Sequence, residues 1–153
     1  MVGEYGFRPP LNSVAQRIVD AEFFYVGPTA NVAKMLPGVV VMGDGIGSVK
    51  EADGTSPYYG ILGYEDAQTG ESRPKNRDTA YSAGARVPVH VDVGLRVRAR
   101  LAAGETIVKG DHLSVSTGGL LVKAEDDAVI YAKAEEPITS TASGTPIWVK
   151  TVI

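Results

Sequence analysis

The sequence contains no cysteine among its 153 residues. Disulfide bonds, thiolate nucleophiles and cysteine-ligated zinc or iron–sulfur sites are therefore excluded. Only two histidines are present, His90 and His112, and neither shows the spacing to other ligands that a metal site needs. We therefore expect no metal and no other cofactor, and we interpret both histidines as surface residues.

Catalytic groups are equally scarce. Ser114, His112 and Asp111 are the residue types of a catalytic triad, but neighbours on a strand point to opposite faces, which keeps them apart. The glycine-rich segment 43–47 would bind a nucleotide phosphate only if it opened a helix, and the turn residues that follow it stop any helix there. Segment 43–47 therefore predicts a turn. The sequence favours a structural or interaction protein over an enzyme.

The chain also lacks a long hydrophobic run and a charge excess of one sign. The most apolar run, residues 35–42, is interrupted by Pro37 and Gly38 and is far too short to cross a bilayer. The N-terminus lacks the basic and apolar regions of a signal peptide. A net charge of −3, from 15 basic and 18 acidic residues, provides no basic excess for nucleic acid. We expect a soluble, non-secreted chain that binds neither membrane nor nucleic acid.

Short strands separated by glycine turns are what the sequence has in abundance. Strands are expected at about 22–26, 39–42, 58–64, 106–108, 112–116, 120–123, 128–134 and 146–152. In the last of them Trp148 alternates with apolar residues, so we expect it in the core or half-buried. Many short strands with regular turns close their edges as a sandwich or a barrel. We therefore predict an all-β domain with a β-sandwich or β-tulip/barrel-like fold; no internal repeat is evident in the sequence.

The clearest strand pattern covers residues 86–101, where every second residue is apolar, mostly valine. This period of two places the valines in the core and the intervening residues in water or at an interface. A straight strand of this length would span about 50 Å. Gly94 is therefore expected to mark a bend or bulge, where the strand passes between two sheets.

Residues 1–20 differ from the rest because they show no alternation. The pair Pro9-Pro10 favours an extended path, followed by at most a short helix. We predict an N-terminal arm at 1–20 and a single β domain at 21–153. Tyr5 and Phe7 lie in this arm, and aromatic residues of this kind are typical anchors of interfaces. They are expected to contact a partner or a neighbouring subunit, with packing on the same chain as the alternative.

Two further regions supply candidate contact residues. A polar insert at about 65–79 has many charged residues and no large apolar one, and a loop of this length is functional or disordered. The polar face of segment 86–101 carries a stripe of arginines, which is either a solvated strand face, a protein interface or a phosphate site. Without interleaved aromatics, single-stranded nucleic acid is disfavoured. The candidate residues are Arg73, Lys75, Arg77, Arg96, Arg98 and Arg100.

A run of short motifs in the last third resembles a known family. The motifs lie at 102–113, 118–119, 131–136 and 144–149. They comprise Ala-Gly, Lys-Gly-Asp with a following apolar strand, a glycine turn, an alanine-rich strand, a second glycine turn and a terminal strand. This pattern resembles the capsid cement or head-decoration proteins of tailed bacteriophages, and Gly60-Ile61-Leu62 is similar to a strand of the lambda-type members. Tyr131-Ala132 departs from a common glycine, and the insert at 65–79 has no counterpart.

The resemblance implies a β-rich homotrimer on the outside of an expanded capsid, present in the host cytoplasm during assembly. Such trimers clamp neighbouring subunits of the major capsid protein. An N-terminal arm that adds a strand to a neighbouring sheet would suit residues 1–20. Three arms acting together make a weak contact durable. The arm contacts implied here are Tyr5, Phe7, Arg8, Pro9 and Leu11.

Other functions remain open at this point. Segment 103–111 is also similar to β-clip domains that bind sugars or sugar acids, which would make the chain a small ligand-binding module. A tail or fibre module of a phage is a further alternative. An enzyme is the least favoured of these classes.

Overall fold

The computed structural model describes residues 21–55, 57–64 and 77–152. The predicted arm contacts in 1–20, and Arg73 and Lys75 of the insert, lie outside these residues. Within them the regular structure is β, apart from the 3-10 helix η1 (Val32–Lys34). Ten of the strands form two closed barrels of five strands each. The predicted all-β, barrel-like fold is therefore confirmed.

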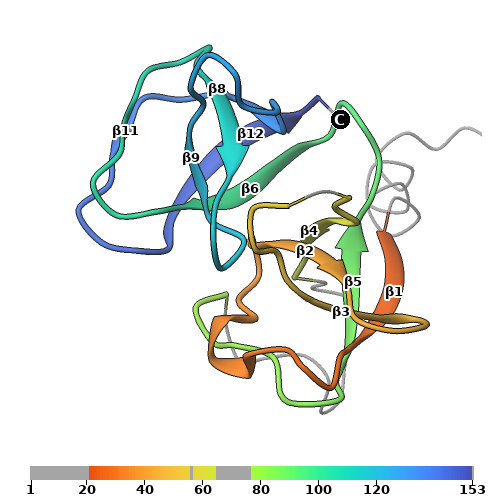
Figure 1. The fold of residues 1–153 in the computed structure, drawn as a ribbon. Coiled ribbons are helices and arrows are strands. Elements are labelled where there is room, and N and C mark those ends of the chain that lie inside the picture. The colour runs from red at the N-terminus through yellow and green to blue at the C-terminus, as the bar shows by residue number, and fades with distance from the viewer. Residues whose placement is uncertain (1–20, 56, 65–76, 153) are drawn as a thin grey trace, which may run out of the picture.

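The first barrel occupies the N-terminal half of the described chain (Figure 1). Its strands are β1 (Ala21–Val26), β2 (Val40–Gly43), β3 (Ser48–Glu51), β4 (Gly60–Leu62) and β5 (Arg86–His90). Around the barrel they follow the order β1-β3-β2-β4-β5. The pair β1–β3 is parallel, and every other neighbouring pair is antiparallel.

The second barrel lies above the first in Figure 1. Its strands are β6 (Arg96–Leu101), β8 (His112–Val115), β9 (Leu121–Lys123), β10 (Ala132–Ala134) and β12 (Thr145–Thr151). They follow the order β10-β12-β6-β9-β8, and only β6–β9 is parallel. A separate ribbon pairs β7 (Thr106–Ile107) with β11 (Ile138–Thr139).

The two barrels have the same topology. When the strands of each barrel are counted in chain order, the first pairs with the third in parallel. The third then pairs with the second, the second with the fourth, the fourth with the fifth, and the fifth with the first, all antiparallel. The fold is therefore repeated although no repeat is evident in the sequence. Short strands require only alternation of apolar residues, and many unrelated sequences satisfy that requirement.

The alternating segment 86–101 connects the two barrels. It forms β5 and β6, and between them the chain turns at Gly94, whose φ is +81°. The predicted bend thus lies at the predicted residue, but it is a turn between barrels and not a kink in one strand. The assignment of Val93 to the core is wrong, because this residue lies in the turn and is 63% exposed.

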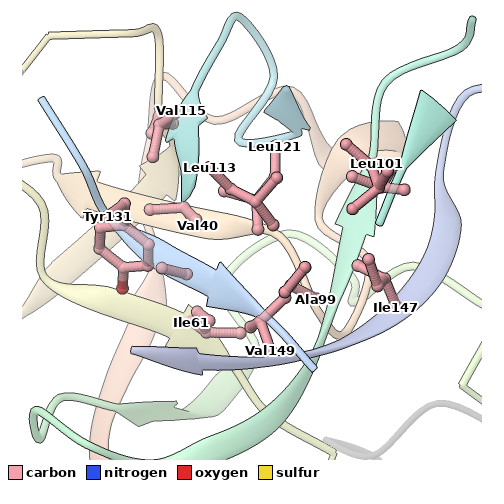
Figure 2. Close-up of a cluster of buried hydrophobic side chains, with 14 residues drawn as sticks. Val40, Ile61, Ala99, Leu101, Leu113, Val115, Leu121, Tyr131, Ile147 and Val149 are labelled. Carbon is pink, nitrogen blue, oxygen red and sulfur yellow. The ribbon is translucent and has the colours of Figure 1, made fainter. Parts of the chain in front are cut away.

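Two hydrophobic clusters form the core. One lies inside the first barrel and includes Val41 and Leu62. The other contains the interior of the second barrel together with Val40 and Ile61 of the first (Figure 2). Because neighbouring residues on a strand face opposite ways, Val40 and Ile61 are on the outer side of the first barrel. Burying these two fully covered side chains joins the barrels through one continuous cluster.

Gly119 joins the barrels through the backbone. Its N–H donates to the carbonyl of Ala52 at 2.8 Å, and its own carbonyl accepts from the N–H of Val40 at 2.9 Å. Its φ of +73° favours glycine, and a Cβ there would lie 2.3 Å from the Val40 oxygen. The Gly118-Gly119 turn therefore connects the second barrel to the first through backbone hydrogen bonds, at a position without room for a Cβ.

Candidate functional site: a cationic surface on the second barrel

A row of basic side chains crosses four strands of the second barrel. The register places Arg96 of β6 opposite Lys150 of β12, and Lys150 opposite Lys133 of β10. Lys133 in turn lies opposite His112 of β8. All four residues are exposed, and their neighbours along the strands include core residues such as Val149. The row therefore lies on the outer surface of the barrel.

Trp148 lies beside this row and directly opposite Arg98. The Cζ atoms of Arg96 and Arg98 lie 5.0 Å and 5.3 Å from the centroid of the indole ring. These distances allow cation–π attraction, which holds both guanidinium groups near the ring. Trp148 is half-buried, as the sequence predicted. We call the surface formed by Arg96, Arg98, Lys133, Lys150, His112 and Trp148 the cationic face.

Carboxylates near the cationic face are engaged by the protein itself. A Glu136 carboxylate oxygen accepts a hydrogen bond from the N–H of Trp148 at 2.8 Å. Glu135 lies 3.6 Å from the Nε of Arg96, and only a quarter of its side chain is exposed, against 64% for the arginine. An exposed ion pair of this kind contributes little, about 1 kcal/mol at most. The cations of the face therefore project further into solvent than the neighbouring carboxylates.

Arg100 does not belong to the cationic face, although the sequence placed it on the same stripe. It is 6% exposed. Its Nε donates to the Pro37 carbonyl at 2.7 Å and its Nη1 to the Gly144 carbonyl at 2.9 Å. Its Nη2 donates to the Arg77 carbonyl and lies 3.2 Å from an Asp78 carboxylate oxygen. The first barrel covers this end of β6, so Arg100 joins the barrels and is not available to a partner.

Arg77 is exposed and lies close to this internal contact. Its carbonyl accepts from Arg100, and its guanidinium carbon lies 5.4 Å from the ring centroid of Tyr64. Nearby, the buried Tyr81 hydroxyl donates to the Gly63 carbonyl at 2.7 Å. Of the four basic candidates that the structure describes, only Arg96 and Arg98 therefore lie together on one open surface.

The hairpin between β2 and β3 carries an apolar residue that the sequence analysis did not single out. Ile46 is fully exposed at its tip, between Gly45 and Gly47. Asp44 holds the hairpin: it accepts hydrogen bonds from the Thr29 hydroxyl at 2.6 Å and the Thr29 N–H at 2.8 Å. The hydroxyl bond holds the pKa of the Asp44 carboxyl below its ordinary value, against an opposing effect of burial. The predicted turn at 43–47 is confirmed.

A shallow hollow lies where the two barrels meet. It is lined by Gly54, Thr55, Tyr58, Ser114, Val115, Ala128 and Val129. The ring of Tyr58 meets the buried ring of Tyr131 edge-on, with centroids 5.7 Å apart. Burial raises the pKa of both phenols, so both hydroxyls remain protonated at neutral pH. The hollow thus offers hydroxyl groups and aromatic surface to a small polar molecule.

No group of three or more histidine, aspartate or glutamate residues gathers for a metal ion within 21–55, 57–64 and 77–152. In the same ranges, no helix has the length and apolar character needed to cross a membrane.

No protein-family model matches the sequence, and no curated protein matches it. Among solved structures, the chain is similar to the N base of the head fiber protein gp8.5 of bacteriophage phi29. The two are 16% identical, and the match covers 86% of this chain and 93% of that chain, with a TM-score of 0.48. Similarity at this level establishes neither a family nor a function.

Proposed function

We propose that the chain is a structural protein of a tailed-phage virion and not an enzyme. It binds the outer surface of the expanded head as a homotrimer and clamps neighbouring subunits of the major capsid protein. Its place is the capsid exterior, and the host cytoplasm during assembly.

One observation carries this proposal: the four motifs of the last third that resemble head-decoration proteins fall within one folded unit. Segments 102–113, 118–119, 131–136 and 144–149 include strands or turns of the second barrel. Gly104, Gly110 and Gly144 have positive φ in its turns, so these motif glycines specify the backbone path. The same barrel presents the cationic face, which gives it a surface for a partner.

The exposed surface suits a protein whose task is contact. Arginine and tryptophan are the residues most enriched at energetic centres of interfaces, and Arg98 and Trp148 lie side by side on the cationic face. A second exposed apolar site exists on the first barrel, at Ile46 and Tyr25. Contacts at several sites on each of three linked copies would strengthen binding without any single strong contact.

The proposal is tested on particles of the phage that encodes the chain. Virions purified on a density gradient are analysed by mass spectrometry, and the chain is expected among the head proteins. Heads stripped of the chain should release DNA at a lower temperature, and purified chain added back should restore the resistance. Absence from purified virions, or recovery with tails only, would contradict the proposal.

The hollow between the barrels favours a second candidate function, a small β-clip-type module that binds sugars or sugar acids. Its hydroxyl-bearing lining residues Tyr58 and Ser114 suit a polar ligand. A ligand that binds only the folded state raises the melting temperature. A thermal-shift screen against sugars and sugar acids therefore tests this function, with Ser114→Ala as the variant expected to reduce any shift.

A further inference from the structure

The shared topology gives each strand of the second barrel a counterpart in the first. Strands β12, β10 and β8 of the second barrel correspond to β5, β4 and β2 of the first. In the first barrel, the outward row across these strands runs from His90 to Ile61 to Val40. The row in the second barrel that crosses the corresponding strands contains Lys150, Lys133 and His112 of the cationic face.

The counterpart row in the first barrel is an interface. Val40 and Ile61 are fully buried, in the same cluster as Leu113 and Val149 of the second barrel (Figure 2). This outward side of the barrel is therefore where the fold already accepts a protein neighbour. In the second barrel the corresponding side is exposed, and Lys133 and His112 lie where the first barrel has the aliphatic Ile61 and Val40.

The basic row is unfavourable for the isolated chain. Lys150 lies directly opposite two other cations, Arg96 on one side and Lys133 on the other. Like charges placed directly opposite each other on neighbouring strands destabilise a sheet. A partner that carries negative charge removes this repulsion when it binds.

We infer that the cationic face docks an acidic protein surface, through Arg96, Arg98, Lys133 and Lys150 around Trp148. The inference rests on the proposed function in one respect: it takes the acidic surface to belong to a protein of the phage head. A protein partner is favoured over nucleic acid because the chain has a net charge of −3 and so provides no basic excess for a run of phosphates, whereas an acidic patch on a protein requires only a few cations. The face also has a single aromatic residue, whereas single-stranded nucleic acid is bound by several.

The tryptophan provides a direct measurement of binding. Trp148 is the only tryptophan in the chain, so its fluorescence reports on the cationic face alone. The full chain is titrated with poly-L-glutamate, and separately with oligodeoxythymidylate of equal charge, between about 50 mM and about 200 mM salt. We expect poly-L-glutamate to change the emission, to bind more tightly than the oligonucleotide, and to bind more weakly as salt rises.

Matched charge reversals locate the binding site. Lys150→Glu, in the centre of the row, should weaken poly-L-glutamate binding roughly tenfold. Lys34→Glu, an equal charge change at an exposed residue of η1, should change the affinity less than about twofold. Equal effects of the two variants, an unchanged emission, or tighter binding of the oligonucleotide would overturn the inference.

This experiment contains no virion, so it is independent of the test on particles. If poly-L-glutamate binds as expected but the chain is absent from virions, the acidic-surface inference stands and the proposed function fails. If the chain is a head protein but heads retain the Lys150→Glu variant as well as they retain the Lys34→Glu variant, the inference fails and the proposed function stands.

Discussion

At the scale of single residues, Arg98 and Arg100 show how position decides the role of a side chain. The two lie two residues apart on β6 and point to the same side of the strand. Arg98 is exposed next to Trp148, whereas Arg100 is covered by the first barrel and donates to the Pro37 and Gly144 carbonyls. Only the packing of the barrels leaves Arg98 exposed and buries Arg100.

We expect Arg100→Met to lower the free energy of unfolding by about 3 kcal/mol, because it leaves buried carbonyl groups without a donor. Arg98→Met, the same change on the same strand, should cost about 0.5 kcal/mol or less. Urea unfolding followed by circular dichroism measures both values. Similar costs for the two variants would contradict the assigned role of Arg100.

The adjacent glycines 118 and 119 make a second comparison at this scale. Both have positive φ, which costs an alanine about 1–2 kcal/mol. Gly119→Ala should cost more, because its Cβ would lie 2.3 Å from the Val40 oxygen, whereas at Gly118 the nearest atom is a Lys34 side-chain carbon at 3.7 Å. We expect Gly119→Ala to have the lower melting temperature by several degrees or more, roughly 4 °C per kcal/mol. Equal melting temperatures would show that the backbone around Val40 shifts to accommodate the added Cβ, and would contradict this prediction.

At the scale of elements, the hairpin between β2 and β3 depends on a contact from outside it. Asp44, in the turn, is held by Thr29, which lies between β1 and η1. A hydrogen bond to the ionised carboxylate lowers its pKa and stabilises the folded state only while the group is charged. The stabilisation is therefore present above the ordinary pKa of 3.8 and is lost as the pH falls through the lower folded value.

Thr29→Val removes the hydroxyl donor, so we expect the pKa of the Asp44 carboxyl to rise towards 3.8. The pKa of Asp53, which the Thr55 hydroxyl lowers in the same way, should not change and serves as the internal control. Carboxyl carbon shifts followed by NMR as a function of pH give both values. An unchanged Asp44 pKa would mean that the hydroxyl bond is not what lowers it.

Strands with several apolar residues were predicted from the sequence, whereas a strand with a single apolar residue was missed. Segments 22–26 and 146–152 were predicted within a residue of β1 and β12 at each end, because apolar side chains recur along them. Strand β3 was missed, since Val49 is its only apolar residue and its neighbours are polar or charged. Its place is set by pairing with β1 and β2, which no local pattern records.

At the scale of the whole molecule, we expect the full chain to form a homotrimer in solution. Light scattering should give a mass near three chains, and the mass should fall when residues 1–20 are removed if the arm lies between subunits. The shortened chain should keep its β circular dichroism, since both barrels are built from residues after 20. A monomer at every concentration would contradict a trimer in solution, and an unfolded truncated chain would contradict the role of the arm.

Part of the cationic face was predicted from the sequence and part was not, because the face combines residues of four strands. Arg96 and Arg98 are found from sequence because they alternate with apolar residues on one strand. Lys133, Lys150 and His112 lie on three other strands, and only the register brings them into one row with Arg96. No spacing along the chain encodes a contact across strands.

The sequence by itself determined that the chain is all-β, where most strands lie, and that Gly94 redirects the chain, because alternation and turn chemistry are local properties. The tertiary structure decided that there are two barrels of one topology, that Arg100 is buried, and that a cationic face exists. Those outcomes depend on which strands pair and on which outer surfaces meet, and both are set by contacts between residues far apart in the sequence.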